Sequence, residues 1–182
     1  MSESNLEQLM YAYVHGDASA FNHIYRRASP SVFSYLLRLT RTQSQAEDLL
    51  QVTFAKAHKA RSSYIPGAPL IPWLLAIARR AFLDEVRMKK GRFDDLSRDG
   101  VLPEQQRVSP ATSEELSDAL ARALNALPEN YRDAIHLTKI TGLSLAEAAD
   151  VLETTSCAVK LRVHRGYNLM RDQLGTLQTA SP

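Results

Sequence analysis

Basic side chains are concentrated on one predicted helix near the C-terminus, where they could bind DNA. They lie in residues 143–166, LSLAEAADVLETTSCAVKLRVHRG. If Val159 points toward a core, the helical period of about 100° per residue directs Leu161, His164 and Arg165 away from that core, and Lys160 and Arg162 flank them. Arginine and lysine can neutralise phosphates or donate to guanine edges, and leucine can contact a thymine methyl group. The candidate DNA-binding residues are Ser156, Lys160, Leu161, Arg162, His164 and Arg165.

Capping signals place two short helices in this segment. Gly142 suits the left-handed position that ends a preceding helix. Ser144 and Glu147 have the spacing of a capping box at the start of the next helix, and Thr154 or Thr155 can cap the helix after it. The pattern predicts a helix-turn-helix whose second helix enters the major groove. The competing interpretation is a solvated, charged face on an ordinary three-helix bundle.

The composition is typical of a globular chain with an uneven charge distribution. Of the 182 residues, 45% are apolar and 23% are charged. Residues 1–92 hold 13 Lys and Arg against 7 Asp and Glu, a net charge of +6. Residues 93–113 and residues 114–182 each carry a net charge of −2. The basic N-terminal part favours an anionic partner.

Several classes of site are absent from the sequence. The single cysteine, Cys157, excludes an intramolecular disulfide and any multi-cysteine zinc site. The five histidines are scattered without the spacing of metal ligands, so we expect no metal and no cofactor. Because no nucleophile–base pair and no phosphate-binding loop is evident, we do not expect an enzyme.

The sequence also predicts a cytoplasmic protein without direct membrane insertion. The polar N-terminus, MSESNLEQLM, lacks the basic start and apolar core of a signal peptide. The longest uncharged stretch, 62–78, contains three prolines and is too short to span a bilayer.

The apolar periodicity is helical almost throughout, and we expect an all-α fold. Asp17 can cap a helix that ends near residue 28, and Ser29–Pro30 has the pattern that opens a second helix. Ser44 and Glu47 have the spacing of another capping box. Further helices are expected at about 72–90, 113–126 and 128–141, before the helix-turn-helix. The predicted organisation is two small helical domains, 1–92 and 114–182, joined by a flexible linker, 93–113.

Three segments, in this order, carry a resemblance to a known family. Residues 46–59, AEDLLQVTFAKAHK, are followed by residues 73–87, WLLAIARRAFLDEVR, and by a longer stretch at 126–166 that includes the helix-turn-helix. The chain resembles bacterial sigma factors of the extracytoplasmic-function (ECF) group. In that family the first segment docks on the clamp helices of RNA polymerase. The second faces the −10 promoter element, and the third reads the −35 element.

The resemblance implies a sigma factor that binds core RNA polymerase, at its clamp helices and flap, and directs promoter-specific initiation. Its partners would be the polymerase, promoter DNA and an anti-sigma factor. On the first segment the expected polymerase-binding residues are polar and lie opposite an apolar face; they are Glu47, Asp48 and Gln51. The expected −10 DNA-binding residues are Tyr64, Arg80, Asp84 and Arg87. In the family the loop before the −10 helix captures a flipped base, and Tyr64 could stack there or anchor the loop to the core.

The sequence departs from the family pattern at several positions. Arg80 stands where asparagine is common, and it could pair with Asp84 four residues later. Gln45 and Val52 replace common acids, and Glu153 replaces a common turn glycine. One alternative function is a stand-alone helix-turn-helix regulator that binds operator DNA by itself. Another is an interaction module that has lost promoter activity.

Overall fold

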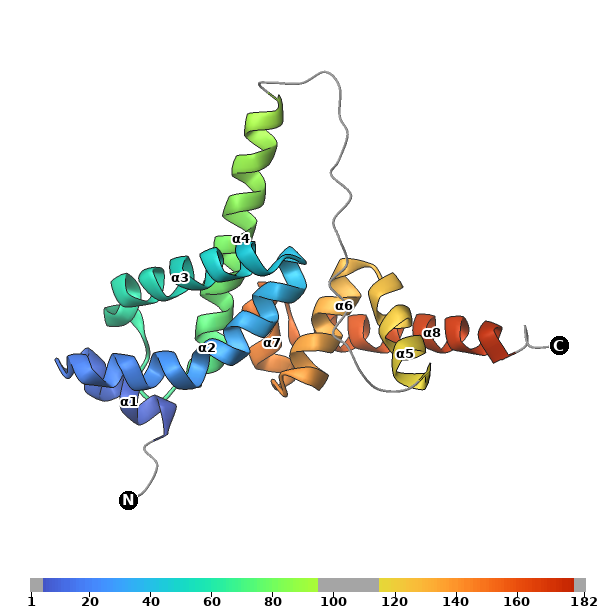
Figure 1. Cartoon of the computed structure of the whole chain (residues 1–182). Coiled ribbons are helices and arrows are strands. Elements are labelled where there is room, and N and C mark those ends of the chain that lie inside the picture. The colour runs from blue at the N-terminus through green and yellow to red at the C-terminus, as the bar shows by residue number, and fades with distance from the viewer. Residues whose placement is uncertain (1–4, 95–114, 179–182) are drawn as a thin grey trace. The chain divides into compact units, whose positions relative to one another are not determined.

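The structure is a computed structural model that describes residues 5–94 and 115–178 (Figure 1). Every regular element within those two ranges is helical, as the sequence predicts. Contacts divide the chain into two compact units, Met1–Val108 and Ser109–Pro182. Apart from its first two residues, the predicted linker at 93–113 lies outside the described residues.

The N-terminal unit packs four α-helices around one core. They are α1 (Leu6–Val14), α2 (Ala18–Thr40), α3 (Gln43–Ala60) and α4 (Leu70–Asp94), with a short 3₁₀ turn, η1 (Arg61–Ser63), after α3. Helices α2, α3 and α4 contact one another pairwise, and α1 packs on α2. Each contributes one apolar stripe, and the fully buried side chains include Val32, Tyr35, Leu36, Leu70, Leu74 and Leu75.

Helix α2 is continuous where the sequence predicted a break before Pro30. Asp17 caps it as expected, accepting a hydrogen bond from the Ser19 N–H at 2.9 Å. Pro30 lies inside the helix and is exposed. An interior proline costs about 3 kcal/mol. The buried stripe continues through Ala28 and Val32 on either side of it, so packing along the whole helix offsets that cost.

Helix α3 begins earlier than predicted, and the expected Ser44–Glu47 capping box is wrong. The N-cap is Thr42, which makes no side-chain cap bond. Glu47 instead accepts a hydrogen bond from the Gln43 side chain at 2.8 Å. The preceding residue, Arg41, ends α2 in the left-handed conformation, with φ 59°. A tight α2–α3 corner therefore sets the register of α3.

The C-terminal unit contains the predicted helix-turn-helix. Its elements are α5 (Glu115–Ala126), α6 (Glu129–Ile135), the π-helix η2 (His136–Ile140), α7 (Leu145–Leu152) and α8 (Ser156–Gln178). The helix predicted at 128–141 thus changes to wider π geometry halfway, and the Thr141 N–H donates to the His136 carbonyl at 2.9 Å. Helices α5, α6 and α8 share a core around Leu127, Ile135 and Met170.

Helix α8 approaches α6 closely at Gly166. A Cβ atom at this position would lie 2.7 Å from Ile135 Cδ1, a distance shorter than van der Waals contact. Glycine thus permits the close approach that seats the predicted DNA-reading helix on the unit's core.

The turn between α7 and α8 carries a strained residue. The Ser144–Glu147 capping box is present, with bonds of 3.2 and 2.7 Å, and Thr155 accepts from the Ala158 N–H at 3.2 Å. Between them Glu153 ends α7 with φ 51° and ψ 49°. This left-handed conformation is costly for a residue with a Cβ atom.

Replacing Glu153 with glycine should stabilise the C-terminal unit by about 1 kcal/mol, because relief of left-handed strain exceeds the added unfolded-state entropy. Urea denaturation measures the change. The control is Asp150→Gly, an exposed helical position three residues earlier, where glycine should lose about 1 kcal/mol. Equal destabilisation by both substitutions would contradict the account of this turn.

Candidate functional site

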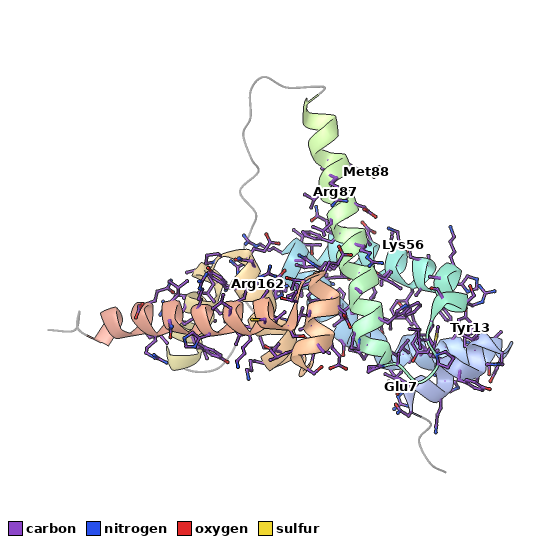
Figure 2. All side chains as sticks on the ribbon, turned by 180° about the vertical axis from the view of Figure 1, so that it is seen from behind. Glu7, Tyr13, Lys56, Arg87, Met88 and Arg162 are labelled. Atoms are coloured by element: carbon purple, nitrogen blue, oxygen red, sulfur yellow. The ribbon has the colours of Figure 1, made fainter. Side chains whose placement is uncertain are left out.

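The first turns of α8 carry the predicted DNA-binding residues, and all of them except Arg162 are exposed. Val159 is fully buried, and this fixes the direction in which α8 faces the core. Arg162, labelled in Figure 2, is half-buried. Leu161 is 46% exposed and offers an apolar contact among cations. The other predicted residues on this surface are also exposed: Ser156, Lys160, His164 and Arg165.

Two residues that the prediction left out belong to this region. Cys157 is exposed in the first turn of α8. Arg132 of α6 is buried, and its guanidinium donates to the carbonyls of Asn125 and Leu127 at 2.7 and 2.6 Å. Arg132 thereby ties the end of α5 to α6, against which α8 packs. A buried arginine that binds carbonyls from a neighbouring helix end carries no spacing signal in the sequence.

Helix α3 presents the predicted polymerase-binding residues on its solvent face. Glu47, Asp48 and Gln51 are all exposed, whereas Leu49 and Phe54 of the same helix are buried. Beside them Val52 is 42% exposed, which adds apolar area to an acidic surface. Carboxylates repel DNA phosphates, so this combination fits a protein partner better than a nucleic acid.

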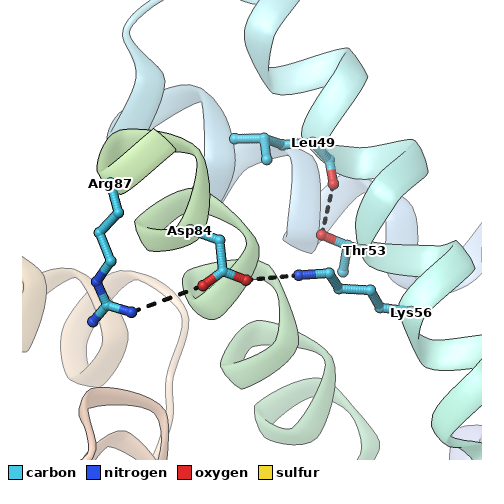
Figure 3. A network of polar contacts seen from close by, with 5 residues as sticks. All are labelled: Leu49, Thr53, Lys56, Asp84 and Arg87. Atoms are coloured by element: carbon cyan, nitrogen blue, oxygen red, sulfur yellow. Dashed lines mark hydrogen bonds and ion pairs between the residues drawn. The ribbon is translucent and has the colours of Figure 1, made fainter. Parts of the chain in front are cut away.

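The exposed face of α4 is linked to α3 by an ion-pair network (Figure 3). Asp84 accepts a hydrogen bond from Lys56 Nζ at 2.9 Å, and Arg87 Nη1 lies 3.9 Å from its other oxygen. The sequence offered Arg80 as a possible partner for Asp84 within α4; the structure also brings Lys56 to it from α3, 28 residues earlier. Lys56 was missed because the i, i+4 rule finds partners only within one helix.

The network also sets the charge state of Asp84. The hydrogen bond and positive charge of Lys56 hold the pKa of Asp84 below its ordinary value, and Arg87 adds a smaller effect in the same direction. A folded-state pKa below the unfolded one stabilises the fold at pH values above the unfolded pKa. That contribution is lost as the pH falls through the folded pKa. Asp84 is thus a carboxylate at neutral pH, flanked by two cations.

The loop before α4 holds Tyr64 in the anchoring role that the sequence left open, not as an exposed stacking surface. Tyr64 is 4% exposed, and its hydroxyl donates to the Ala68 carbonyl. Its ring packs edge-to-face on Trp73, with centroids 5.4 Å apart. Burial raises the pKa of Tyr64, and the charge of Glu7 adds to the rise. The large side chain that the loop exposes is instead Ile65, at 72%.

Within the residues that the structure describes, no three His, Cys, Asp or Glu side chains are grouped so that they could hold a metal ion. No helix in the same ranges is both long and apolar enough to cross a membrane.

Comparisons with known proteins agree on one family. Residues 24–92 match Sigma-70 region 2, and residues 117–170 match Sigma-70, region 4. The RNA polymerase sigma factor CarQ of Myxococcus xanthus is 34% identical over 163 residues, which cover 90% of this chain and 94% of CarQ. The ECF RNA polymerase sigma factor SigM of Bacillus subtilis is 34% identical over 153 residues, covering 82% of this chain and 92% of SigM.

A solved structure shows the same similarity. The sigma factor RpoE, crystallised with the anti-sigma factor NepR from Bartonella quintana, superposes with a TM-score of 0.73 at 30% identity. The match covers 85% of this chain and 96% of RpoE.

Removing the Lys56 amine should raise the pKa of Asp84 toward its ordinary value, because the substitution Lys56→Met deletes the hydrogen bond and the nearest positive charge. Carboxyl chemical shifts followed through an acid titration measure the change. Lys59→Met removes the same charge from an exposed position on α3 and should leave Asp84 almost unaffected. The network is refuted if the two variants shift the Asp84 titration equally.

Proposed function

Because this chain belongs to the extracytoplasmic-function sigma factors of bacterial RNA polymerase, we propose that its two units read the two elements of one promoter from the surface of the core enzyme. Members of this family are not enzymes. As a member, the chain binds core polymerase and directs promoter-specific initiation of transcription. The proposal assigns that activity to particular surfaces of each unit.

The exposed side of α3 is the proposed polymerase-binding surface. It consists of Glu47, Asp48 and Gln51, with Val52 beside them. The observation that carries the proposal is the amphipathic division of α3, because its buried face leaves these four side chains free to meet a partner. An acidic patch with an exposed aliphatic side chain beside it complements a basic protein surface.

The proposed −10 surface is formed by α4 and the loop before it. Arg80 and Arg87 are exposed cations on α4, and the proposed role of Asp84 is to orient Arg87. Extruding a base from the stack costs a few kcal/mol, which a pocket must offset by contacts to that base. Tyr64 holds this loop through its hydrogen bond to Ala68 and its packing on Trp73. Arginine binds guanine edges or phosphates in preference to adenine edges. With Arg80 at this position, the chain should therefore prefer a different −10 sequence from family members that have asparagine there.

The proposed −35 reader is the exposed surface of α8. Its side chains provide three cations, a leucine and an imidazole, and together they can contact phosphates and base edges in one major groove. Lys160 and Arg165 are exposed, and Val159 and Gly166 seat the helix on the core. The small number of cations is reasonable if core polymerase supplies much of the affinity.

We also propose that an anti-sigma factor regulates this chain. RpoE was crystallised with an anti-sigma factor, which supports a partner of the same kind for this chain. Such a partner would inhibit transcription by covering surfaces on α3, α4 or α8. We propose that the chain acts in the cytoplasm, since core polymerase works there.

Run-off transcription with core polymerase and a promoter library tests the function. We expect the chain to stimulate transcripts from a subset of promoters. Gln51→Lys should lose most of that stimulation because it places a cation at the polymerase-binding surface. Asn22→Lys makes the same chemical change at an exposed position on α2 and should remain active. Transcripts from no promoter, or equal activity of both variants, would refute the proposal.

Salt dependence tests the −35 surface. Arg165→Ala should weaken binding of the holoenzyme to promoter DNA and lower the slope of log affinity against log salt by about one, if Arg165 contacts a phosphate. Arg122→Ala removes an exposed arginine from α5 and should change neither quantity. An unchanged slope and affinity for Arg165→Ala would remove that residue from the DNA surface.

A further inference from the structure

The start of α4 is held by a residue of α1, the first helix of the N-terminal unit. Glu7 lies in the first turn of α1, and its Oε1 accepts a hydrogen bond from the Leu70 N–H at 3.2 Å. Leu70 is the first residue of α4, so this contact spans 63 positions of the sequence. Figure 2 shows Glu7 beside the beginning of that helix.

Glu7 performs the task that a local N-cap side chain usually performs. The first N–H groups of a helix have no partner within it, and the positive end of the helix dipole favours a carboxylate. The residues immediately before α4, 65–69, read IPGAP and contain no hydroxyl, amide or carboxylate side chain that could serve as a cap. A helix that cannot be capped locally is therefore capped by an acid from α1.

The same carboxylate lies near the other end of this loop. Its charge acts on Tyr64, whose ring contacts Trp73 and whose hydroxyl binds Ala68. The Ala68 N–H in turn donates to the Ile65 carbonyl at 3.0 Å. Hydrogen bonds within the loop thus hold its turn, and the hydrogen bond from Leu70 to Glu7 attaches its end to α1. Displacing Glu7 would release the α4 end of that arrangement.

The second oxygen of Glu7 makes this position costly. Oε2 is buried and has no hydrogen-bond partner among the described side chains and backbone. Burying part of a carboxylate without a partner is unfavourable. Glu7 is therefore not an ordinary surface acid. Its hydrogen bond with the Leu70 N–H offsets part of the cost of burying the carboxylate.

We propose that Glu7 is a positioning residue for −10 recognition, which fixes the loop at 64–70 by capping α4. Helix α1 then belongs to the promoter-reading unit, although the match to Sigma-70 region 2 begins only at residue 24. This inference rests on the proposed −10 role of the loop. It adds a residue that touches no DNA and controls the geometry of the segment that does.

Two substitutions separate the cap from the charge. Glu7→Ala removes the acceptor, whereas Glu7→Gln keeps an acceptor oxygen and removes the charge. The control is Glu129→Gln, which neutralises an exposed acid in the first turn of α6, in the other unit. All variants are made in the full chain, and their helix content is compared by circular dichroism.

The first measurement is the fluorescence of Trp73, the only tryptophan of the chain, in the absence of polymerase. Because its ring packs on Tyr64, its emission reports on the loop. We expect a red shift in Glu7→Ala, a smaller shift in Glu7→Gln and none in Glu129→Gln. Emission identical to wild type in Glu7→Ala would overturn the inference whether or not the chain stimulates transcription.

The second measurement is run-off transcription from promoters that differ only in the −10 element. Loss of a cap corresponds to about a fivefold change in a conformational equilibrium. We therefore expect Glu7→Ala to lower discrimination among these promoters about fivefold, with Glu7→Gln intermediate and polymerase affinity unchanged. Unchanged discrimination, or polymerase affinity that falls in parallel, would overturn the positioning role.

If Glu7→Ala does not fold, Glu7→Gln decides the matter by the same two measurements. Wild-type emission and discrimination in Glu7→Gln would then count against the inference. Failure of the proposed function would give a different result, because the wild-type chain itself would then produce no transcript. The Trp73 emission would still report on the Glu7 cap in that case.

Discussion

Burial of one apolar stripe on each helix is the constraint on which the other features of this protein depend. The side chains proposed to bind a partner are exposed because their neighbours on the same helix are buried. On α3 the burial of Leu49 and Phe54 turns Asp48 toward solvent, and on α8 the burial of Val159 does the same for Lys160. Each unit therefore presents its binding surface as a consequence of building its core.

Connections between helices then fix how these surfaces are oriented within a unit. The Lys56–Asp84 pair joins α3 to α4, and the Glu7–Leu70 contact joins α1 to the start of α4. In the C-terminal unit the close approach at Gly166 has the same role for α8. An exposed ion pair is weak, so Lys56–Asp84 contributes orientation more than stability.

The sequence predicted the features that depend on local patterns. The all-α class, the capping box at Ser144 and the direction of Val159 follow from spacing alone, and the structure confirms them. The prediction failed where tertiary packing overrides a local signal, as at Pro30, which lies inside α2. It also missed Lys56, Arg132 and Glu7, because their partners lie on other helices. Tyr64 could be assigned to the loop, but only packing against Trp73 shows that its ring faces inward.

Promoter binding measured with and without core polymerase tests the central claim most directly. The DNA fragment should carry both promoter elements, and a matched fragment should lack them. If the two units are halves of one polymerase-bound reader, specific binding should be tight only when core polymerase is present. Equally tight, specific binding by the chain alone would contradict the account and favour a stand-alone operator-binding regulator.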